Sequence, residues 1–458
     1  VDLLDGVSLP ASSTLFVDSM LARTPALEAD RDAAFRRTVE RLDTLGKMDF
    51  TVPVSLKATL RGYQVDGYQW LGSLEHLGLG GILADDMGLG KTLQMIAHIL
   101  ARVEAGDTKP TLVVCPASLV YNWTAELERF APSLDVCAIV GAKAQRRVQI
   151  AGAAEHNVVV TSYDLMRRDI DEYAGQDFAR VVLDEAQYIK NPLTQVARAT
   201  KRLPAGVRFA LTGTPIENRL SELWSIFDFL MPGLLGTRES FAKRFESPVE
   251  HAEGDSAARL QALVSPFVLR RVKEDVVADL PEKIEDTVVA QLTGEQRKLY
   301  LANQDRIAQQ VQHREAGEFK KDKLKVLAEL TKLRQICCDP RLHYEDYKAG
   351  SAKLDTCMEL VRGALDGGHR ILLFSQFTGM LDIIGKRLAK EDIAFLKLTG
   401  ASSKESRAKM VAQFQAVEVP VFLISLKAGG VGLNLTAADV VIHYDPWWNV
   451  AAQDQATD

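Results

Sequence analysis

Short apolar runs alternate with helical stretches in two separate parts of the chain. Before residue 230 the runs occupy 81–84, 111–115, 158–161, 181–183 and 209–212, and after residue 370 they occupy 371–374, 421–425 and 440–443. A strand with one solvent-exposed face would alternate apolar and polar residues. Continuous apolar strands between helices instead indicate a parallel sheet that is covered on both faces. The pattern predicts an α/β fold with two parallel-sheet lobes.

Helical periodicity and charge replace the apolar runs between the two lobes. Residues 220–230, 257–268 and 296–337 are predicted to be helical, and 285–290 is a short strand candidate. The predicted organisation is a helical leader (1–55, with a helix at 26–45), lobe one (56–218), a helical insertion and linker (219–281), the start of lobe two with its own helical insertion (282–345), and lobe two (346–458).

Length and composition limit the class of protein. At roughly 150 residues per domain, 458 residues predict three domains or two large ones. Apolar residues make up 47% and charged residues 25%, which excludes disordered, collagen-like and disulfide-scaffold chains. The best candidate for a membrane helix, 419–444, is interrupted by Lys427, Asn434 and Asp439, so we expect no membrane partner.

Charge and cysteine content narrow the class further. The 55 Lys and Arg residues against 61 Asp and Glu give a net charge of −6, so a nucleic-acid site would have to be a local basic cleft on an acidic body. The 5 cysteines form no CxxC pair, which argues against zinc sites and disulfides and favours a reducing compartment. The start lacks both Met and a basic n-region, so we expect no secretory signal and a piece of a longer protein.

The strongest local signal is a glycine-rich loop that follows a predicted strand and opens a predicted helix. Backbone N–H groups of such a loop face a phosphate, and glycines let the backbone approach it. Lys91 would reach the β- and γ-phosphates and Thr92 would hold Mg²⁺. Alternatively, the segment is a strand–helix turn with an incidental Lys-Thr pair. The loop consists of Asp85, Asp86, Met87, Gly88, Leu89, Gly90, Lys91 and Thr92.

Two adjacent acids follow the predicted strand at 181–183. Ligands bind at the carboxyl ends of parallel strands, so Asp184 would hold Mg²⁺ through water and Glu185 would orient and deprotonate an attacking water. A solvated acid pair is the alternative. Upstream, Tyr63 and Gln64 precede the loop, and a Gln amide can form two hydrogen bonds with an adenine edge. Gln64 could equally be a surface residue.

These segments belong to a longer ordered set. Taken together the set resembles the ATPase core of the Swi/Snf family, within helicase superfamily two, from about residue 56 to the end. Asp85 at the first loop position is normal for that family, and Ala186-Gln187 resembles bacterial and archaeal members. The set comprises residues 63–64, 85–92, 184–187, 211–215, 267–271, 333–337, 374–377, 425–435 and 445–449.

The resemblance implies two RecA-like lobes with helical insertions between and within them, and ATP with Mg²⁺ in the cleft. It also implies DNA contacts that hold phosphates without reading sequence. Trp123 is expected to pack rather than stack on bases, as are Trp447 and Trp448, while Arg270-Arg271 either brace the lobes or are solvated. The implied DNA contacts are Ser118, Asn122, Trp123, Ser162, Tyr163, Gln376, Ser425 and Lys427.

Two further segments bear on activity. Lys320, Lys321, Lys323 and Lys325 form either a solvated helix face or a DNA contact, and His443 is expected to be structural. Residues 449–458 match the start of the last family motif, whose arginines lie further on in relatives. The 458-residue form is therefore expected to hydrolyse ATP slowly unless Arg370 or Arg407 substitutes.

The function that this resemblance implies is an ATP-driven motor on double-stranded DNA, cytoplasmic and nucleoid-associated. The alternatives are a strand-separating helicase, an RNA-stimulated ATPase, and a nucleotide-gated scaffold that binds DNA or a protein without turnover. A protein partner would be chosen by flanking domains.

Overall fold

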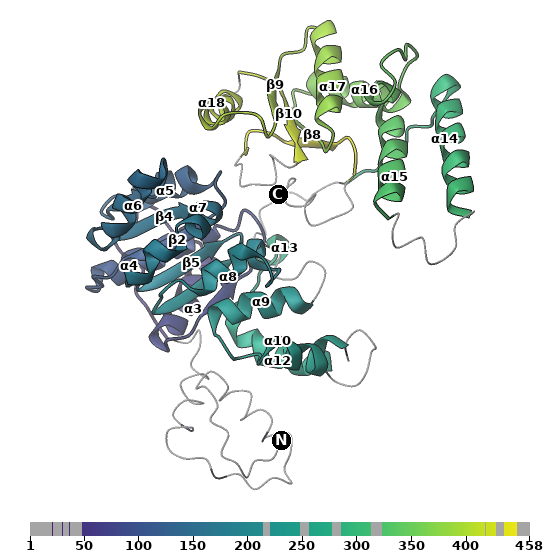
Figure 1. Ribbon diagram of the computed structural model, residues 1–458. Coiled ribbons are helices and arrows are strands. Elements are labelled where there is room, and N and C mark those ends of the chain that lie inside the picture. Colours follow the sequence, from purple (N-terminus) through teal and green to yellow (C-terminus); the bar gives the residue numbers. More distant parts are fainter. Residues whose placement is uncertain are drawn as a thin grey trace. The chain divides into compact units, whose positions relative to one another are not determined.

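The computed structural model describes residues 48–213, 220–247, 256–276, 285–312, 323–416, 418–426 and 435–446, with the single positions Leu21, Asp30 and Arg36. The chain divides into two units, Val1–Leu280 and Pro281–Asp458, each with its own sheet (Figure 1). Apart from the single positions, the predicted leader helix lies outside the described residues, as do the side chains of the 320–325 lysine cluster.

The sheet of the first unit has seven strands within the described ranges, and each neighbouring pair is parallel. The order across the sheet is β3-β4-β2-β5-β6-β1-β7. The predicted runs all form strands here, which confirms the predicted fold class for this unit. The strands are β1 (Gly81–Leu83), β2 (Thr111–Cys115), β3 (Val136–Ala138), β4 (Val158–Ser162), β5 (Arg180–Asp184), β6 (Val207–Leu211) and β7 (Val268–Leu269).

Helices cover both faces of this sheet, because every residue of β2, β4 and β5 is buried. Hydroxyl caps start the helices that follow two of the loops: Ser162 accepts from the N–H of Leu165, and Thr194 accepts from the N–H of Ala197. These helices are α3 (Gly62–His76), α4 (Lys91–Glu104), α5 (Val120–Phe130), α6 (Lys143–Ala151), η3 (Ala153–Glu155), α7 (Tyr163–Arg168), η4 (Ile170–Gly175), η5 (Ala186–Ile189) and α8 (Gln195–Lys201).

The helical insertion of the first unit ends in a strand. The predicted helix at 257–268 is too long, because it stops at Val264 and Pro266 lies in a short 3₁₀ turn that replaces it. Val268 and Leu269 then pair with Ile82 and Leu83 of β1. The elements after β6 are α9 (Leu220–Leu230), α10 (Arg238–Phe241), η6 (Ala242–Glu246), α12 (Ser256–Val264), η7 (Ser265–Phe267) and α13 (Lys273–Val276).

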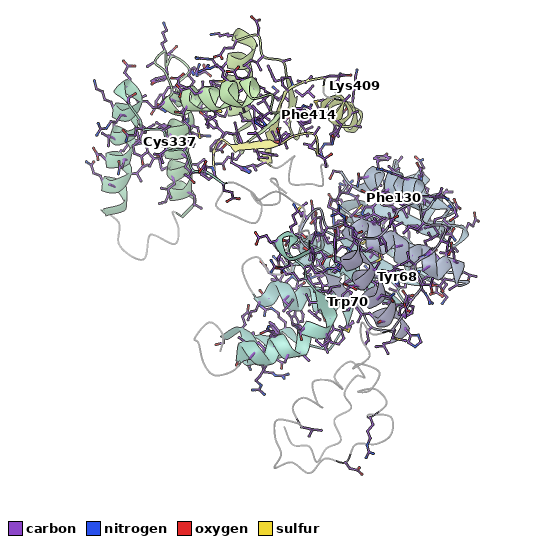
Figure 2. All side chains as sticks on the ribbon, turned by 180° about the vertical axis from the view of Figure 1, so that it is seen from behind. Tyr68, Trp70, Phe130, Cys337, Lys409 and Phe414 are labelled. Atoms are coloured by element: carbon purple, nitrogen blue, oxygen red, sulfur yellow. The ribbon has the colours of Figure 1, made fainter. Side chains whose placement is uncertain are left out.

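Helix α3 ties this late segment to the start of the unit. Figure 2 labels Tyr68 and Trp70, both of which are buried. The Tyr68 hydroxyl donates to the carbonyl of Thr51 at 2.8 Å, and the Trp70 indole donates to the carbonyl of Pro266 at 3.3 Å. The segments that contain Thr51 and Pro266 therefore both contact one helix.

A buried ion network lies at the amino-terminal ends of the strands. Arg180, the first residue of β5, is fully buried and donates to Glu75 at 2.8 Å, to Thr111 at 3.0 Å and to Asp107. The Nε2 atom of His98 lies 2.6 Å from Oε2 of Glu75, the same oxygen that accepts from Arg180 at 2.8 Å. Burial alone would raise the pKa of Glu75, but the hydrogen bonds from His98 and Arg180 lower this pKa to about 2. Glu75 is thus held as a carboxylate.

The second unit has a four-stranded sheet in its described part, again all parallel, with the order β11-β8-β10-β9. The half-exposed edge strand β9 was not predicted. Residues 285–290 are not a strand, because five of the six are exposed and no apolar face is covered. The strands are β8 (Ile371–Ser375), β9 (Phe395–Leu398), β10 (Val421–Ser425) and β11 (Val440–His443).

The predicted helical stretch at 296–337 forms two helices that pack against each other. Gln296 joins them to the rest of the unit, because its amide donates to the carbonyl of Ile336 at 2.9 Å and accepts from the N–H of Ala352 at 3.1 Å. No helix in the described ranges is long and apolar enough to cross a bilayer. The helices are α14 (Gly294–Gln312), α15 (Lys323–Cys338), η8 (Pro340–Leu342), α16 (Ala352–Asp366), α17 (Thr378–Lys390) and α18 (Lys404–Gln415).

Candidate nucleotide-binding site

The predicted phosphate loop connects the end of β1 to the start of α4. Gly88 and Gly90 both have left-handed backbone conformations, with φ of 83° and 78°, which glycine adopts without steric strain. A β-carbon at Gly90 would also lie 2.5 Å from the Gln64 amide nitrogen. Both positions therefore require glycine. The loop ends at the amino terminus of a 14-residue helix, and the N–H groups of that terminus favour binding of an anion.

Lys91 lies inside the loop that precedes it. Its ammonium donates to the carbonyls of Asp85 at 2.6 Å and Asp86 at 3.3 Å. Burial lowers the pKa of Lys91, while the negative charges of Glu185 and Asp184 oppose that shift. The loop lysine and the acid pair of β5 thus form one electrostatic cluster, and their roles in binding a nucleotide stay predictions.

Asp184 ends β5 and is held by three donors. The indole of Trp123 donates to Oδ2 at 2.8 Å, the N–H of Glu185 donates to Oδ1 at 2.9 Å, and the Tyr163 hydroxyl donates to the carbonyl at 2.8 Å. Burial raises the pKa of Asp184, and the Trp123 hydrogen bond and the charge of Lys91 oppose this rise. Each carboxylate oxygen keeps a lone pair for a further ligand.

The side chains of Trp123, Ser162 and Tyr163 have partners within the first unit, and their predicted contact with DNA stays a prediction. Trp123 is fully buried and Tyr163 is 3% exposed, and both support Asp184. Ser162 is also 3% exposed, and its hydroxyl caps α7. The expectation that Trp123 packs rather than stacks on bases is correct.

Glu185 adopts a left-handed conformation, with φ of 53° and ψ of 55°, which non-glycine residues populate sparsely. Its carboxylate accepts from the Gln187 amide at 2.7 Å, and the Gln187 carbonyl oxygen accepts from the Thr212 hydroxyl at 2.9 Å. Gln187 therefore fixes Glu185 to the end of β6. The sequence offered Gln187 only as a mark of bacterial and archaeal relatives, and its bridging role was missed.

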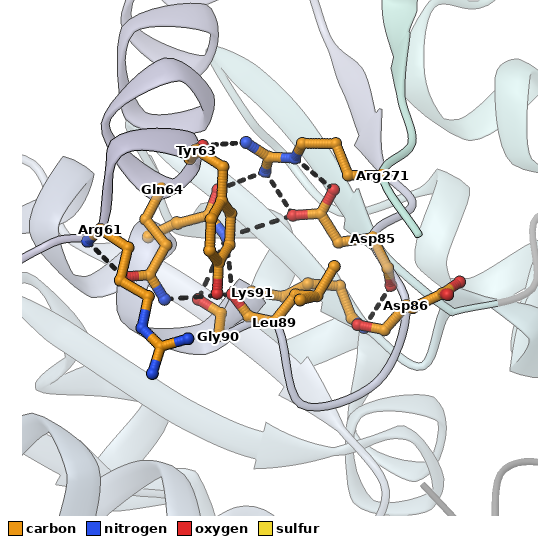
Figure 3. A network of polar contacts seen from close by, with 10 residues as sticks. Arg61, Tyr63, Gln64, Asp85, Asp86, Leu89, Gly90, Lys91 and Arg271 are labelled. Carbon is orange, nitrogen blue, oxygen red and sulfur yellow. Dashed lines mark hydrogen bonds and ion pairs between the residues drawn. The ribbon is translucent and has the colours of Figure 1, made fainter. Parts of the chain in front are cut away.

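Gln64 connects the start of α3 to the phosphate loop. The side chain is 7% exposed. Its amide donates to the carbonyl of Leu89 at 3.1 Å and accepts from the N–H of Arg61 at 2.9 Å (Figure 3). Gln64 is thus not a surface residue, and its contact with adenine, like that of Tyr63, stays a prediction.

Asp85 does not offer its side chain to a nucleotide. The carboxylate is fully buried and forms an ion pair with Arg271, whose Nε donates to Oδ1 at 2.8 Å (Figure 3). Asp85 therefore belongs to the nucleotide site through its place in the loop backbone, and the Arg271 guanidinium is bound within the first unit and is not solvated. Arg270 is exposed. Within the loop, Asp86 and Met87 are half-buried and Leu89 is buried.

Three of the remaining predicted DNA contacts, Ser118, Gln376 and Asn122, keep their predicted role. The Ser118 hydroxyl and the Gln376 amide nitrogen are buried, and neither finds a hydrogen-bond partner among the described residues. Asn122 is exposed and donates to Glu126 at 3.1 Å. Ser425 is 3% exposed at the end of β10, and its predicted contact stays a prediction. Lys427 lies outside the described residues.

The donor set suits a magnesium ion that arrives with phosphates. In the part of the chain that the structure describes, no group of three His, Cys, Asp or Glu side chains could hold a metal on its own. Mg²⁺ is usually bound through one or two carboxylates, waters and phosphate oxygens. Asp184, with its free lone pairs, and Thr92, which follows Lys91, fit that requirement.

Comparison with protein families identifies both parts of the chain. Residues 63–342 match the SNF2-related domain, and residues 352–458 match the helicase conserved C-terminal domain. Among solved structures, the Sulfolobus solfataricus SWI2/SNF2 ATPase core in complex with dsDNA is 37% identical with a TM-score of 0.51 and covers 89% of this chain and 87% of that one.

Curated relatives agree with these matches. YwqA of Bacillus subtilis, named as a candidate ATP-dependent helicase/translocase, is 40% identical over 96% of this chain and 49% of its own length. The TATA-binding protein-associated factor mot1 of Schizosaccharomyces pombe is 35% identical over 92% of this chain and 26% of its own length. The chain thus spans about half or less of the length of these relatives. Since the SNF2-related match covers more than half of its residues, this chain belongs to the SNF2 family of ATPase cores, within helicase superfamily two.

Proposed function

We propose that this chain is the motor core of an ATP-dependent translocase on double-stranded DNA, which hydrolyses ATP to ADP and phosphate. The observation that carries the proposal is the cluster of Lys91, Asp184 and Glu185, which joins the phosphate loop to the acid pair. The match to a solved core in complex with dsDNA supports DNA as the track.

The residues of the cluster have distinct roles in this proposal. Lys91 and the loop N–H groups bind the β- and γ-phosphates, and Asp184 with Thr92 holds Mg²⁺, which neutralises charge on the phosphates when bound. Glu185 orients the attacking water and accepts its proton. Gln187 and Thr212 keep the Glu185 carboxylate in one orientation, which is what positioning catalysis requires.

Steady-state ATPase rates with and without blunt duplex DNA test the activity. We expect duplex DNA to stimulate turnover in the full-length protein.

Lys91→Ala should abolish turnover, because the phosphates lose their fixed cation. Glu185→Gln should bind Mg-ATP normally and turn over at background, because an amide cannot accept the proton. Loss of ATP binding in Glu185→Gln, or wild-type turnover in Lys91→Ala, would contradict these roles.

The same preparation distinguishes a translocase from its alternatives. A translocase displaces a bound third strand from a triplex without separating the duplex, whereas a strand-separating helicase releases a strand from a forked duplex. Stimulation by RNA in place of duplex DNA would indicate an RNA-dependent ATPase. Binding of ATP and DNA with no turnover in the full-length protein would indicate a scaffold.

A further inference from the structure

The chain that follows β7 runs along the phosphate loop. Strands β7 and β1 are parallel neighbours, so they end at the same edge of the sheet. The N–H of Ala84 donates to the carbonyl of Leu269 at 2.7 Å, and the N–H of Asp86 donates to the carbonyl of Arg271 at 2.9 Å. The N–H of Lys273 in turn donates to the Asp86 carboxylate at 3.2 Å. Residues 269–273 are therefore fixed alongside residues 84–86.

Arg271 locks this arrangement. Its guanidinium pairs with the fully buried Asp85, donates to Gln94 at 2.7 Å and to the carbonyl of Tyr63, and lies 5.4 Å from the Tyr63 ring centre (Figure 3). A buried carboxylate that loses its partner is strongly unfavourable. The phosphate loop and the segment that carries Lys273 are thus held together as one rigid piece.

The side chain of Lys273 lies against the middle of the loop. A β-carbon at Gly88 would be 3.3 Å from Cε and 3.6 Å from Nζ of Lys273. Gly88 is exposed and has φ of 83°, and it belongs to the run of loop N–H groups that face a phosphate. The Lys273 ammonium is therefore within reach of an anion bound in the loop.

The carboxylates around the phosphate loop would repel a bound phosphate, and a second cation beside Lys91 would offset that repulsion. Asp86, Asp184 and Glu185 place negative charge near the phosphates, and the Lys91 ammonium already donates to two loop carbonyls. Lysine binds phosphate as a compact point charge and needs no fixed orientation. We propose that Lys273 is a second phosphate-binding cation of the nucleotide site, a role that rests on the proposed binding of ATP.

The test compares nucleotide affinities of variants at this position. Dissociation constants for ATP, ADP, inorganic tripolyphosphate and adenosine are measured by competition against a fluorescent ADP analogue. Lys273→Ala should weaken the three phosphate ligands about tenfold, the loss of one charge-assisted hydrogen bond. Lys273→Arg should restore most of the affinity, and Lys273→Glu should weaken the three ligands further. Adenosine affinity should not change.

Two controls separate binding from folding. The N–H of Lys273 and the side chain of Arg271 anchor the segment, and both are kept in Lys273→Ala, so this variant should fold, which its urea unfolding curve measures. Arg270→Ala removes the same charge from an exposed neighbour and should leave all four affinities unchanged. Unchanged ATP and tripolyphosphate affinities in Lys273→Ala, or equal losses for adenosine, would overturn the inference while leaving ATP binding intact. A wild-type protein that binds no ATP would overturn both the inference and the proposed function.

Discussion

Asp184 shows how a buried residue is kept ready for chemistry. Its carboxylate is buried deeply enough to raise its pKa, and the Trp123 indole donates a hydrogen bond that opposes this rise. A neutral Asp184 would be a poor magnesium ligand. The indole hydrogen bond therefore favours the ionised form of Asp184, and its loss should change the pH dependence of turnover.

Trp123→Phe keeps an aromatic ring in the buried site and removes the N–H. The pKa of Asp184 should rise further, so more acid is protonated at a given pH. A hydrogen bond to a charged group contributes about 1.5–3 kcal/mol, so the acidic limb of the ATPase pH profile should move to higher pH by about one to two units.

The matched control is Trp70→Phe, which removes an indole hydrogen bond to a neutral carbonyl in the same unit. Its pH profile should coincide with that of the wild type. Coincident profiles for Trp123→Phe and wild type would show that Trp123 does not set the charge of Asp184.

The sequence was sufficient to identify the candidate residues that belong to local motifs. Lys91 and Asp184 could be found because a glycine loop and a strand-end acid are visible as local patterns. Arg271 could not be placed, because its partner Asp85 lies 186 positions earlier and no local pattern specifies such a contact. The role of Gln187 was missed for the same reason, since Thr212 lies 25 positions away.

Among the elements, β7 shows why short strands escape prediction. It has two residues, directly after a 3₁₀ turn, and the helical periodicity before it continues through the sequence. Strands β2 and β4 were predicted because both of their faces are buried, and this burial requires a continuous run of mainly apolar residues. A two-residue strand is specified by its neighbour β1, and its own sequence carries almost no signal.

The Glu75 network joins α3, α4 and β5, and its stability should depend on pH. The folded pKa of Glu75, about 2, is below the usual value of 4.5. Its contribution is therefore fully present above the unfolded pKa and is lost as pH falls from about 4.5 towards 2. A shift of this size corresponds to about 3 kcal/mol. Glu75→Gln should lower the urea midpoint at pH 7, and the gap from wild type should narrow below about pH 4.5.

An exposed pair serves as the control for this prediction. Lys109 and Asp177 form an ion pair at 2.7 Å with both side chains more than half exposed. Asp177→Asn should change stability by less than about 0.5 kcal/mol. A gap between Glu75→Gln and wild type that stays constant down to pH 2 would contradict the assigned charge state.

For the whole molecule, a net charge of −6 means that DNA binding depends on local groups and not on a general attraction. The polar groups that remain as predicted contacts, such as Ser118 and Asn122, would bind phosphates, which are the same in every sequence. The logarithm of affinity should therefore fall linearly with the logarithm of salt concentration, with little sequence preference. Fluorescence anisotropy with several duplexes between about 50 and 200 mM salt measures both.

One result would remove DNA translocation as the function. A single duplex sequence that binds more than about a hundredfold tighter than scrambled controls at equal salt would show base recognition, since that ratio is near the top of what one base pair discriminates.

The late arrival of β7 has a consequence during synthesis on the ribosome. β1 is complete at residue 83, but the strand that covers its outer edge emerges only at residue 268. At roughly 5–20 residues per second, the nascent chain spends on the order of ten to forty seconds with that edge unpaired. An uncovered apolar edge can pair with another chain. The pairing of β7 with β1, which also places residues 269–273 beside the phosphate loop, therefore ends the period in which a newly made chain can mispair at this edge.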